Sequence, residues 1–417
     1  MQKNALYAQS GGVTSVINAS ACGVIQTARA HPDRIGRVFA ADNGILGVLN
    51  EDLIDLDQES PETIAALKHT PGGAFRSCRF DLGDFESHRH QYERLIEVFE
   101  AHDIGYFFYN GGGGSMLTAR KVAWLSEKMG HPIVCMGIPK TIDNDLPLTD
   151  TSPGFGSAAK YIATSVREVS FDLSSMATTS TKVFVLEVMG RHAGWLAAAA
   201  GLAFEGEDPP LLLLLAEVPH DSARFLNALR DKVHRHGWCI VVAAEGLRCV
   251  DGQFCGVEQA SPIFGHEQLG GLAPKLAHQI REGLGYKTHW AVSDYFQRSA
   301  RHLASAVDVE QAYAVGRAGV ELALAGKNAM MPVIRRLSSR PYFWEIDAVN
   351  LTEVADVEMP VPPSFIREDG YGITEVAREY MAPLIEGESY PPFVHGLPDY
   401  ARIRGVKVPK KLSAWGG

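Results

Sequence analysis

Residues 106–115 read YFFYNGGGGS, and this stretch carries the main signal for the fold. The uninterrupted apolar run at residues 106–109 is typical of a β-strand covered on both faces, as the strands of parallel sheets are. The run leads directly into Asn110 and four consecutive glycines. Glycine in regular structure costs roughly 0.5–1 kcal/mol relative to alanine, so four in a row favour a turn whose backbone must touch a ligand. A strained turn without a ligand is the alternative.

Six further apolar runs of strand length occur along the chain. They lie at residues 4–9, 37–41, 133–136, 182–188, 211–216 and 239–244. Helical patterns lie between several of them, such as residues 86–101 and residues 221–235, where Asp221 is a candidate N-cap. This alternation predicts an α/β fold with parallel sheets, and the number of strands favours more than one sheet.

Two other polar loops also follow predicted strands. Residues 11–18 read GGVTSVIN after the first strand, and residues 137–145 follow the strand at residues 133–136. Ligands of open α/β sheets bind outside the carboxyl ends of the strands, so the three loops predict one composite anion site. GGVTSVIN lacks the GK[ST] ending of a P-loop, and alone it indicates a tight turn as well as it indicates a phosphate site.

The loop at residues 139–145 reads PKTIDND. It places Lys140 and the carboxylates of Asp143 and Asp145 within six residues. These groups supply a cation for a phosphate, a base for a hydroxyl group and an anchor for magnesium. A structural turn rich in Asp and Asn is the alternative interpretation of the same residues.

A fourth motif, EVMGRHAGW at residues 187–195, again follows an apolar strand and precedes a helical pattern. Arg191 at such a helix start can hold a sugar phosphate. By itself the pattern favours an exposed arginine beside a glycine that is needed for packing.

Composition and charge exclude several classes of function. The 417 residues suggest two or three lobes, and 46% apolar with 21% charged residues is ordinary for a globular protein. The net charge of −10 disfavours a nucleic-acid or membrane-surface partner, which would need a broad basic face. An anionic substrate must therefore be held by local Arg, Lys and backbone amide groups.

The six cysteines form no CxxC pair and no cluster with zinc spacing. In a large acidic chain we expect them to be reduced thiols of a cytoplasmic protein. The N-terminus lacks the pattern of a signal peptide, and no apolar run approaches the roughly 20 residues that span a bilayer. The basic stretch at residues 407–411 is short, and we expect it to be a solvated tail.

The four motifs together, in this order, resemble the phosphofructokinase family over about residues 4–340, and the whole chain is similar to its pyrophosphate-dependent branch. The resemblance implies two Rossmann-like three-layer lobes with mainly parallel sheets and an active site in the cleft between them. It implies a phosphoryl-donor-binding lobe at residues 1–154 plus 295–345. Residues 155–294 plus 346–417 would form the fructose 6-phosphate-binding lobe with a C-terminal extension packing onto it. A homodimer or homotetramer is implied.

The resemblance also implies a reaction, the reversible Mg²⁺-dependent transfer of a phosphoryl group from pyrophosphate to the 1-hydroxyl of fructose 6-phosphate. Asp143 would take the proton from this hydroxyl, while Lys140 and Arg191 would steady the phosphates. Asp145, with Asp143, would hold the Mg²⁺ ion. Catalysis would come from positioning and from neutralising charge on the transferring group.

Binding roles are implied for two further sets of residues. Fructose 6-phosphate would be bound by Thr141, Lys182, Met189, Gly190, Arg191, Glu245, Tyr295 and Arg298, with Lys182 reaching it across a subunit interface. The donor would be bound by Gly11, Gly12, Arg79, Gly112, Gly113, Gly114, Ser115 and Lys140.

Two positions bear on the choice of donor, and they favour different donors. Lys140 is typical of pyrophosphate users in this family, and its ammonium group can grip a small phosphate. The usual companion is a carboxylate in the GGxxS loop, where it would obstruct ATP, but this chain has Gly114 there. Gly113 likewise stands where many relatives have a magnesium-binding Asp. We favour pyrophosphate, with an ATP-dependent 6-phosphofructokinase as the alternative.

Functions of other classes fit less well. The two glycines would suit a non-catalytic, regulatory relative, but such a protein would not need both the TIDND and the EVMGR motifs. An NAD-kinase-like enzyme does not account for GRHAGW and FQRS. A dehydrogenase would need GxGxxG after the first strand, which this chain lacks.

Overall fold

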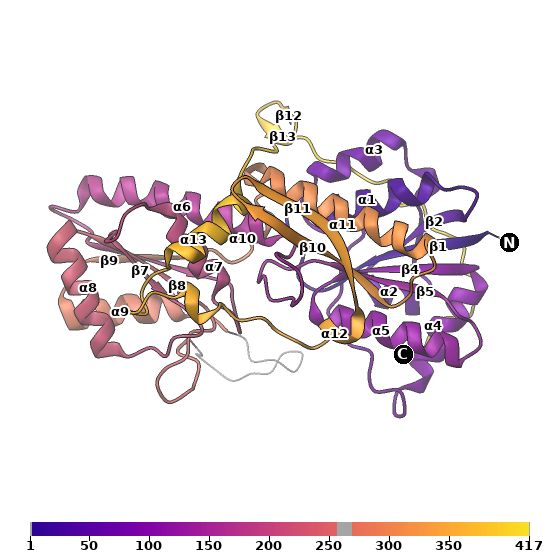
Figure 1. Cartoon of the computed structure of the whole chain (residues 1–417), viewed down its shortest axis with the longest axis horizontal. Coiled ribbons are helices and arrows are strands. Elements are labelled where there is room, and N and C mark those ends of the chain that lie inside the picture. Colours follow the sequence, from indigo (N-terminus) through magenta and orange to yellow (C-terminus); the bar gives the residue numbers. More distant parts are fainter. Residues whose placement is uncertain (1, 257–268, 417) are drawn as a thin grey trace.

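The larger of two sheets contains strands from the two ends of the chain. A computed structural model describes residues 2–256 and 269–416. The sheet has the order β11-β10-β5-β4-β1-β2-β3 (Figure 1). Its strands are β1 (Lys3–Gln9), β2 (Ile35–Ala41), β3 (Leu53–Asp55), β4 (Ile104–Gly111), β5 (Val134–Pro139), β10 (Met330–Ser339) and β11 (Tyr342–Asn350). Only the two edge pairs, β2–β3 and β10–β11, are antiparallel.

The smaller sheet is parallel throughout and has the order β7-β8-β6-β9. Its strands are β6 (Val183–Val188), β7 (Leu211–Leu214), β8 (Cys239–Ala244) and β9 (Thr288–Val292). All seven strands predicted from apolar runs are present, with their ends shifted by a few residues. The predicted α/β class with mainly parallel sheets is confirmed.

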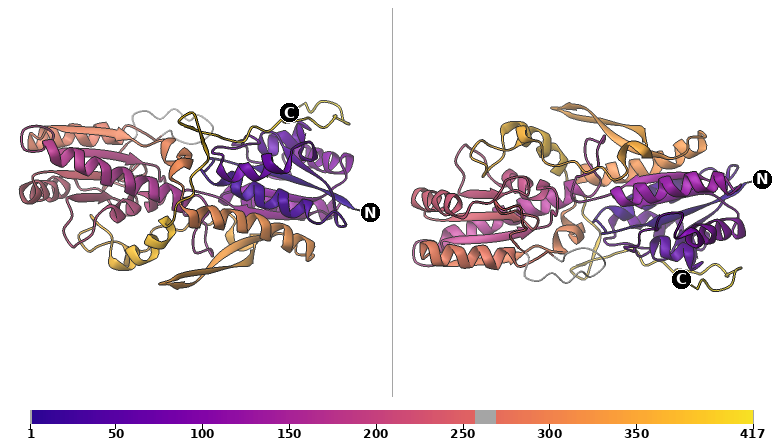
Figure 2. Two further views of the ribbon diagram at one scale, coloured as in Figure 1. Left: turned by 90° about the horizontal axis from the view of Figure 1, so that it is seen from above. Right: turned by 90° about the horizontal axis from the view of Figure 1, so that it is seen from below.

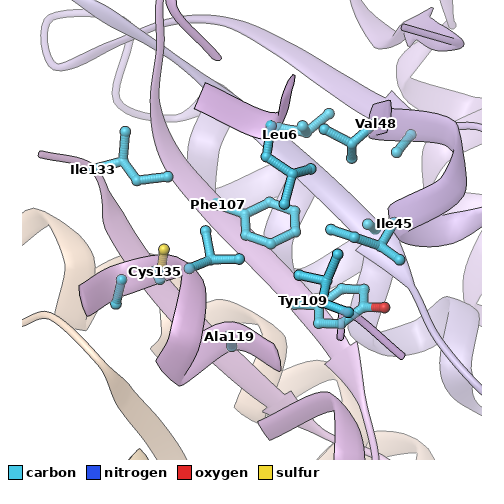
Figure 3. Close-up of a cluster of buried hydrophobic side chains, with 14 of the residues drawn as sticks. Leu6, Ile45, Val48, Phe107, Tyr109, Ala119, Ile133 and Cys135 are labelled. Atoms are coloured by element: carbon cyan, nitrogen blue, oxygen red, sulfur yellow. The ribbon is translucent and has the colours of Figure 1, made fainter. Parts of the chain in front are cut away.

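Helices cover both faces of the first sheet. These helices are α1 (Ile17–Arg29), α2 (Gly44–Leu49), α3 (Pro61–Ala66), α4 (Arg89–Ala101), α5 (Gly113–Lys128), α11 (Ala306–Leu324) and α12 (Leu351–Val354). Because side chains alternate along a strand, β1 sends Leu6 to one face and Tyr7 to the other. Leu6 packs with Phe107 of β4 and Ile45 of α2 (Figure 3), whereas Tyr7 belongs to the core beneath α1 and α11.

The second lobe has the same three-layer build. Its helices are α6 (Phe155–Met176), α7 (Trp195–Ala199), α8 (Ser222–His236), α9 (Leu272–Leu284), α10 (Phe296–Ser299) and α13 (Glu375–Met381). Asp221 caps α8 as predicted, accepting a hydrogen bond from the Arg224 amide at 2.9 Å. Gly237 ends that helix with a φ of 82°, a conformation that glycine adopts without a steric cost.

The C-terminal segment, predicted to pack onto the second lobe, contacts both lobes. Val361 and Met381 lie in the core of the second lobe. The chain then crosses to the first lobe, where Val408 and Leu412 pack (Figure 2). The β11 strand and α12 also belong to the first lobe. The division of the chain into a donor lobe and a sugar lobe stays a prediction.

The basic end of the chain is docked, which corrects the expectation of a solvated tail. The buried carboxylate of Glu51 accepts hydrogen bonds from the amides of Lys411 and Leu412 at 2.5 and 3.1 Å, and His102 contacts it at 2.6 Å. Lys407 pairs with Asp42. The tail therefore makes specific buried contacts that its composition does not indicate.

Two cysteines also differ from expectation, since Cys249 and Cys255 form a disulfide. The expectation that every cysteine is reduced is wrong for this pair. The loop between them turns back on itself, because the Cys255 amide donates to Leu247 O at 2.8 Å, which brings the two sulfurs together. Within the described ranges, none of the helices has the length and apolar character needed to cross a membrane.

Candidate active site

A cleft of about 1310 Å³ lies between the two lobes, where carboxyl ends of strands from both sheets meet. The loops after β1, β4, β5, β6, β8 and β9 all reach it. The predicted site residues that line it are Gly11, Gly12, Arg79, Gly112, Gly113, Gly114, Ser115, Lys140, Thr141, Asp143, Asp145, Met189, Arg191, Glu245, Tyr295 and Arg298. The structure therefore brings together motifs that lie far apart in the sequence.

The PKTIDND loop is held in shape by its own polar groups. The Asp143 amide donates to Thr141 Oγ1 at 3.0 Å. Asn144 is buried with a left-handed φ of 53°, and its Oδ1 accepts a hydrogen bond from the Ser152 amide at 2.9 Å. Its Nδ2 donates to the hydroxyl of Tyr380 at 3.0 Å. These bonds turn Asn144 away from the cleft and leave Asp143 and Asp145 lining it.

Asp143 is a carboxylate suited to accept a proton near neutral pH. Burial raises its pKa to about 7, and the negative charges of Asp145 and Glu245 act in the same direction. Lys140 partly offsets this increase. A base whose pKa lies near the working pH combines the correct protonation state with an adequate driving force for proton transfer.

Lys140 lies buried beside these carboxylates. Burial lowers the pKa of its ammonium group to about 8, while the nearby Asp143 and Asp145 raise it and the cations Arg79 and Arg298 lower it. A Cβ atom at Gly11 would lie 3.5 Å from Lys140 Nζ, so the ammonium group lies close beside the first glycine loop. The cation is thus placed to meet a phosphate held by that loop.

Asp145 fits the role of a metal ligand. Burial raises its pKa, and within the described part of the chain its buried Oδ1 accepts no hydrogen bond. A divalent cation would satisfy this oxygen and relieve the repulsion between Asp143 and Asp145. Residues 2–256 and 269–416 contain no group of three or more His, Cys, Asp or Glu side chains arranged for a metal.

The glycines after β1 allow two arginines to approach the backbone. A Cβ atom at Gly12 would lie 2.7 Å from Arg298 Nη1 and 3.6 Å from Arg79 Nη2. Any larger residue there would displace Arg298. The Ser77 hydroxyl donates to Gly11 O at 2.7 Å, which ties the loop carrying Arg79 to the glycine turn.

The other lobe supplies groups suited to a sugar phosphate. Gly190 has a φ of 138°, and a Cβ atom there would lie 2.5 Å from Ala193 O, so the turn requires glycine. Its amide donates to Glu245 Oε1 at 3.4 Å. Burial raises the pKa of Glu245, whereas the hydrogen bond from Gly190 and the charge of Arg191 lower it.

Two more predicted sugar-site residues lie in contact with each other. The Arg298 guanidinium stacks over the Tyr295 ring at 3.9 Å, with Tyr295 exposed toward the cleft. Lys182 lies elsewhere. It precedes β6 at the end opposite the cleft and donates to the carbonyl oxygens of Ala177 and Thr178. Within one chain, Lys182 is thus not brought to the site.

Several lining residues were missed by the sequence analysis. Gln297 is buried and accepts a hydrogen bond from the Met189 amide at 3.2 Å, which joins the loops after β6 and β9. Its position just before Arg298 was the available signal. Asp81 and Glu358 also line the cleft. Asp81 lies two residues after Arg79, but Glu358 comes from the C-terminal segment and no motif marks it.

A cleft between two parallel α/β lobes, with a buried lysine, perturbed carboxylates and glycine turns at strand ends, is typical of an enzyme that transfers phosphoryl groups. The sequence agrees with this class, because the phosphofructokinase family matches residues 4–323. The chain belongs to the phosphofructokinase family.

Three relatives are similar over nearly their whole length. The pyrophosphate–fructose 6-phosphate 1-phosphotransferase of Methylococcus capsulatus is 63% identical over 99% of this chain and 98% of its own. The protein of the same name from Halomonas elongata is 61% identical with the same coverage. The crystal structure of pyrophosphate-dependent phosphofructokinase from Nitrosospira multiformis is 56% identical, covers 99% of this chain and 100% of its own, and has a TM-score of 0.92.

Proposed function

We propose that this chain catalyses the reversible transfer of a phosphoryl group from pyrophosphate to the 1-hydroxyl of fructose 6-phosphate. The observation that carries the proposal is the placement of Asp143, with its raised pKa, beside the buried Lys140 in one cleft. The full-length relatives with the corresponding name support the choice of substrates.

Asp143 acts as the general base. The 1-hydroxyl of the sugar donates its proton to the Asp143 carboxylate as the oxygen attacks the terminal phosphorus of pyrophosphate. The bond to the bridging oxygen breaks, and inorganic phosphate leaves with the electron pair. In the reverse direction, protonated Asp143 returns the proton to the sugar oxygen.

Charge on the phosphates is balanced by cations from both lobes. Lys140 and Arg79 hold the donor, together with the amides of the glycine loops. Arg191 holds the sugar phosphate and steadies the transferring group. Arg298, which lies against Gly12 in this structure, can reach either substrate. Preorganised cations of this kind stabilise a transition state whose charge lies on the phosphoryl oxygens.

We propose Mg²⁺ as the metal, held by Asp145 with help from Asp143. The orphaned Oδ1 of Asp145 supports this assignment. When bound, the ion would neutralise charge on the donor phosphates. Mg²⁺ commonly uses one or two carboxylates and takes its other ligands from phosphates and water.

We propose that the protein is a homodimer or homotetramer and that Lys182 contacts sugar phosphate in the cleft of a neighbouring subunit. Exposed apolar side chains on the second lobe support a contact with another copy. Phe171 and Met176 of α6 are 72% and 45% exposed, and Trp290 on the edge strand β9 is 46% exposed. A cytoplasmic location and a role in glycolysis follow from the proposed substrates.

The test is the reverse reaction followed by phosphorus NMR. Fructose 1,6-bisphosphate, phosphate and Mg²⁺ should give fructose 6-phosphate and a pyrophosphate signal with the purified protein. No pyrophosphate signal, with sugar bisphosphate binding intact by calorimetry, would contradict the proposal.

An ATP-dependent 6-phosphofructokinase is the second candidate, and one observation favours it. A Cβ atom at Gly113 would have no heavy atom of the described residues within 4 Å, so the donor loop has room for a larger donor. The same measurement made in the forward direction with ATP separates the two candidates.

A further inference from the structure

The glycine loop before α5 lines the cleft at one end of the proposed donor region. A Cβ atom at Gly112 would lie 3.7 Å from Lys140 O, so the loop begins beside the reacting groups. It then continues through Gly113 and Gly114 into a helix of 16 residues. Unpaired amides at a helix N-terminus attract anions. A donor with more than two phosphates would extend from Lys140 along these glycines.

The carboxylate of Asp81 lies beside the glycines along which a longer donor would extend. A Cβ atom at Gly114 would lie 4.0 Å from Asp81 Oδ1, and Asp81 lines the cleft with an exposed side chain. Its charge reaches the loops of the donor region. After burial, which is the main cause, Asp81 contributes to the raised pKa of both Cys78 and Tyr109.

The backbone around Asp81 is fixed on both sides. On one side, the backbone of Cys78 forms a parallel β-bridge with Ser10. The Cys78 carbonyl accepts a hydrogen bond from the Gly11 amide at 3.0 Å. On the other, Leu82 is buried, and its carbonyl accepts a hydrogen bond from Lys121 Nζ of α5 at 3.3 Å. The backbone that carries Asp81 is therefore anchored to the first glycine turn on one side and to α5 on the other.

We propose that Asp81 determines donor length by disfavouring any donor with a phosphate beyond the second. This inference rests on the proposed function. Lys140 and Arg79, together with the proposed Mg²⁺ ion, offset the charge of a diphosphate, whereas a third phosphate at Gly113 and Gly114 meets the like charge of Asp81. Asp81 places a carboxylate beside position 114 from a different loop, so the glycine there does not open the site to ATP. Specificity of this kind depends on a repulsive element as well as on attractive ones.

The test uses linear tripolyphosphate, which adds one phosphate and no nucleoside. Its inhibition constant against pyrophosphate and the KM of pyrophosphate are measured at fixed free Mg²⁺ for the wild type and Asp81→Asn. The ratio of inhibition constant to KM should fall about tenfold in the variant, which is the effect of one like charge about 4 Å away in a wet cleft. Asp84→Asn is the matched control, because Asp84 is an exposed carboxylate of the same segment that bonds to Ser87 instead. The control ratio should stay at the wild-type value.

A second variant restores a negative charge beside the glycine loop, this time from position 114 of α5. Gly114 belongs to α5 and has room for a side chain, so Gly114→Asp in the Asp81→Asn background fits without a steric clash. The double variant should return the ratio toward its wild-type value. ATP turnover should follow the same order, highest in Asp81→Asn and lower in the double variant.

Two outcomes would overturn the inference. An unchanged ratio in Asp81→Asn, with pyrophosphate turnover present, would show that the carboxylate does not select donor length. A higher Mg²⁺ requirement with the same ratio would make Asp81 a metal ligand. Absence of pyrophosphate turnover in the wild type would instead contradict the proposed function, so the two failures are distinguishable.

Discussion

At the scale of single residues, burial gives opposite shifts to the two central groups of the cleft. It raises the pKa of Asp143 to about 7 and lowers that of Lys140 to about 8. At a pH between about 7 and about 8, most Asp143 carboxyl groups are ionised and can accept a proton, while most Lys140 ammonium groups are still charged. Each group also supports the charged form of the other.

This pair predicts a bell-shaped pH profile of kcat/KM. Activity should rise with pH through about 7 as Asp143 loses its proton, and fall above about 8 as Lys140 loses its charge. Lys140→Arg keeps a positive charge at all these pH values, so its decline at high pH should disappear. Steady-state rates of the two proteins in matched buffers test this, and an unaltered high-pH limb in the variant would show that another group causes it.

A second prediction separates catalysis from binding. Asp143→Ser should lower kcat about 10²–10⁴-fold, because the base acts in the chemical step. The dissociation constant of fructose 6-phosphate, measured by calorimetry, should change far less. Asp33→Ser, at an exposed position of the first lobe, is the control and should keep wild-type kcat. Turnover of Asp143→Ser within a few fold of wild type would remove Asp143 from its role.

The residues predicted from sequence were those that belong to short motifs. Lys140, Asp143 and Asp145 lie within one loop, so a single stretch of sequence reveals them. Asp81 lies near Gly114 only because the loop that precedes α4, at residues 70–88, meets the loop after β4 in space. No spacing in the sequence encodes that contact. Lys182 was predicted to act across a subunit interface, and within one chain it lies away from the cleft.

At the scale of elements, the buried strands were the most predictable part. Continuous apolar runs such as Leu211–Leu214 leave little alternative to a strand covered on both faces. The strand β11 is half-buried and has no such run, because Glu345 and Asp347 interrupt its apolar residues, and it was not predicted. The docking of the C-terminal tail could not be predicted either, because it depends on the buried carboxylate of Glu51, far away in the sequence.

The tail gives a prediction at this scale. Burial alone would raise the pKa of Glu51, but hydrogen bonds from the Lys411 amide, His102 and the Leu412 amide lower it. Glu51→Gln removes a charged acceptor, which should cost roughly 1.5–3 kcal/mol of docking free energy. Amide hydrogen exchange at residues 401–415 should become faster while β1 stays protected. Glu353→Gln, an exposed carboxylate on α12, is the control. Equal exchange in Glu51→Gln and wild type would show that Glu51 does not hold the tail.

At the scale of the whole molecule, the proposed function places the donor and the sugar on opposite walls of one cleft. The Gly11–Gly12 turn and the loop before α5 belong to the first lobe, while Gly190 and Glu245 belong to the second. The proposed transfer would therefore depend on how the two lobes are placed relative to each other. Within the second lobe, Gln297 joins the loops after β6 and β9. Water is excluded more fully if the lobes close on the substrates.

The proposed oligomer can be tested by complementation between subunits. Asp143→Ser lacks the base, and Lys182→Ala lacks the residue proposed to act in the neighbouring cleft. Mixed oligomers contain some sites with an intact Asp143 and an intact Lys182 from the other subunit. Unfolding and refolding the two variants together should therefore give more activity than the sum of the two refolded separately. Activity equal to that sum would contradict a shared site.

The most direct test of the whole account is the formation of fructose 1,6-bisphosphate from fructose 6-phosphate and Mg²⁺, with pyrophosphate or ATP as the donor. The account predicts rapid product formation with pyrophosphate and little with ATP, because Lys140 and Arg79 suit a diphosphate and Asp81 opposes a longer donor. Product with ATP alone would contradict the donor assignment. No product with either donor, while fructose 6-phosphate still binds, would contradict the proposal that the chain is an active phosphotransferase.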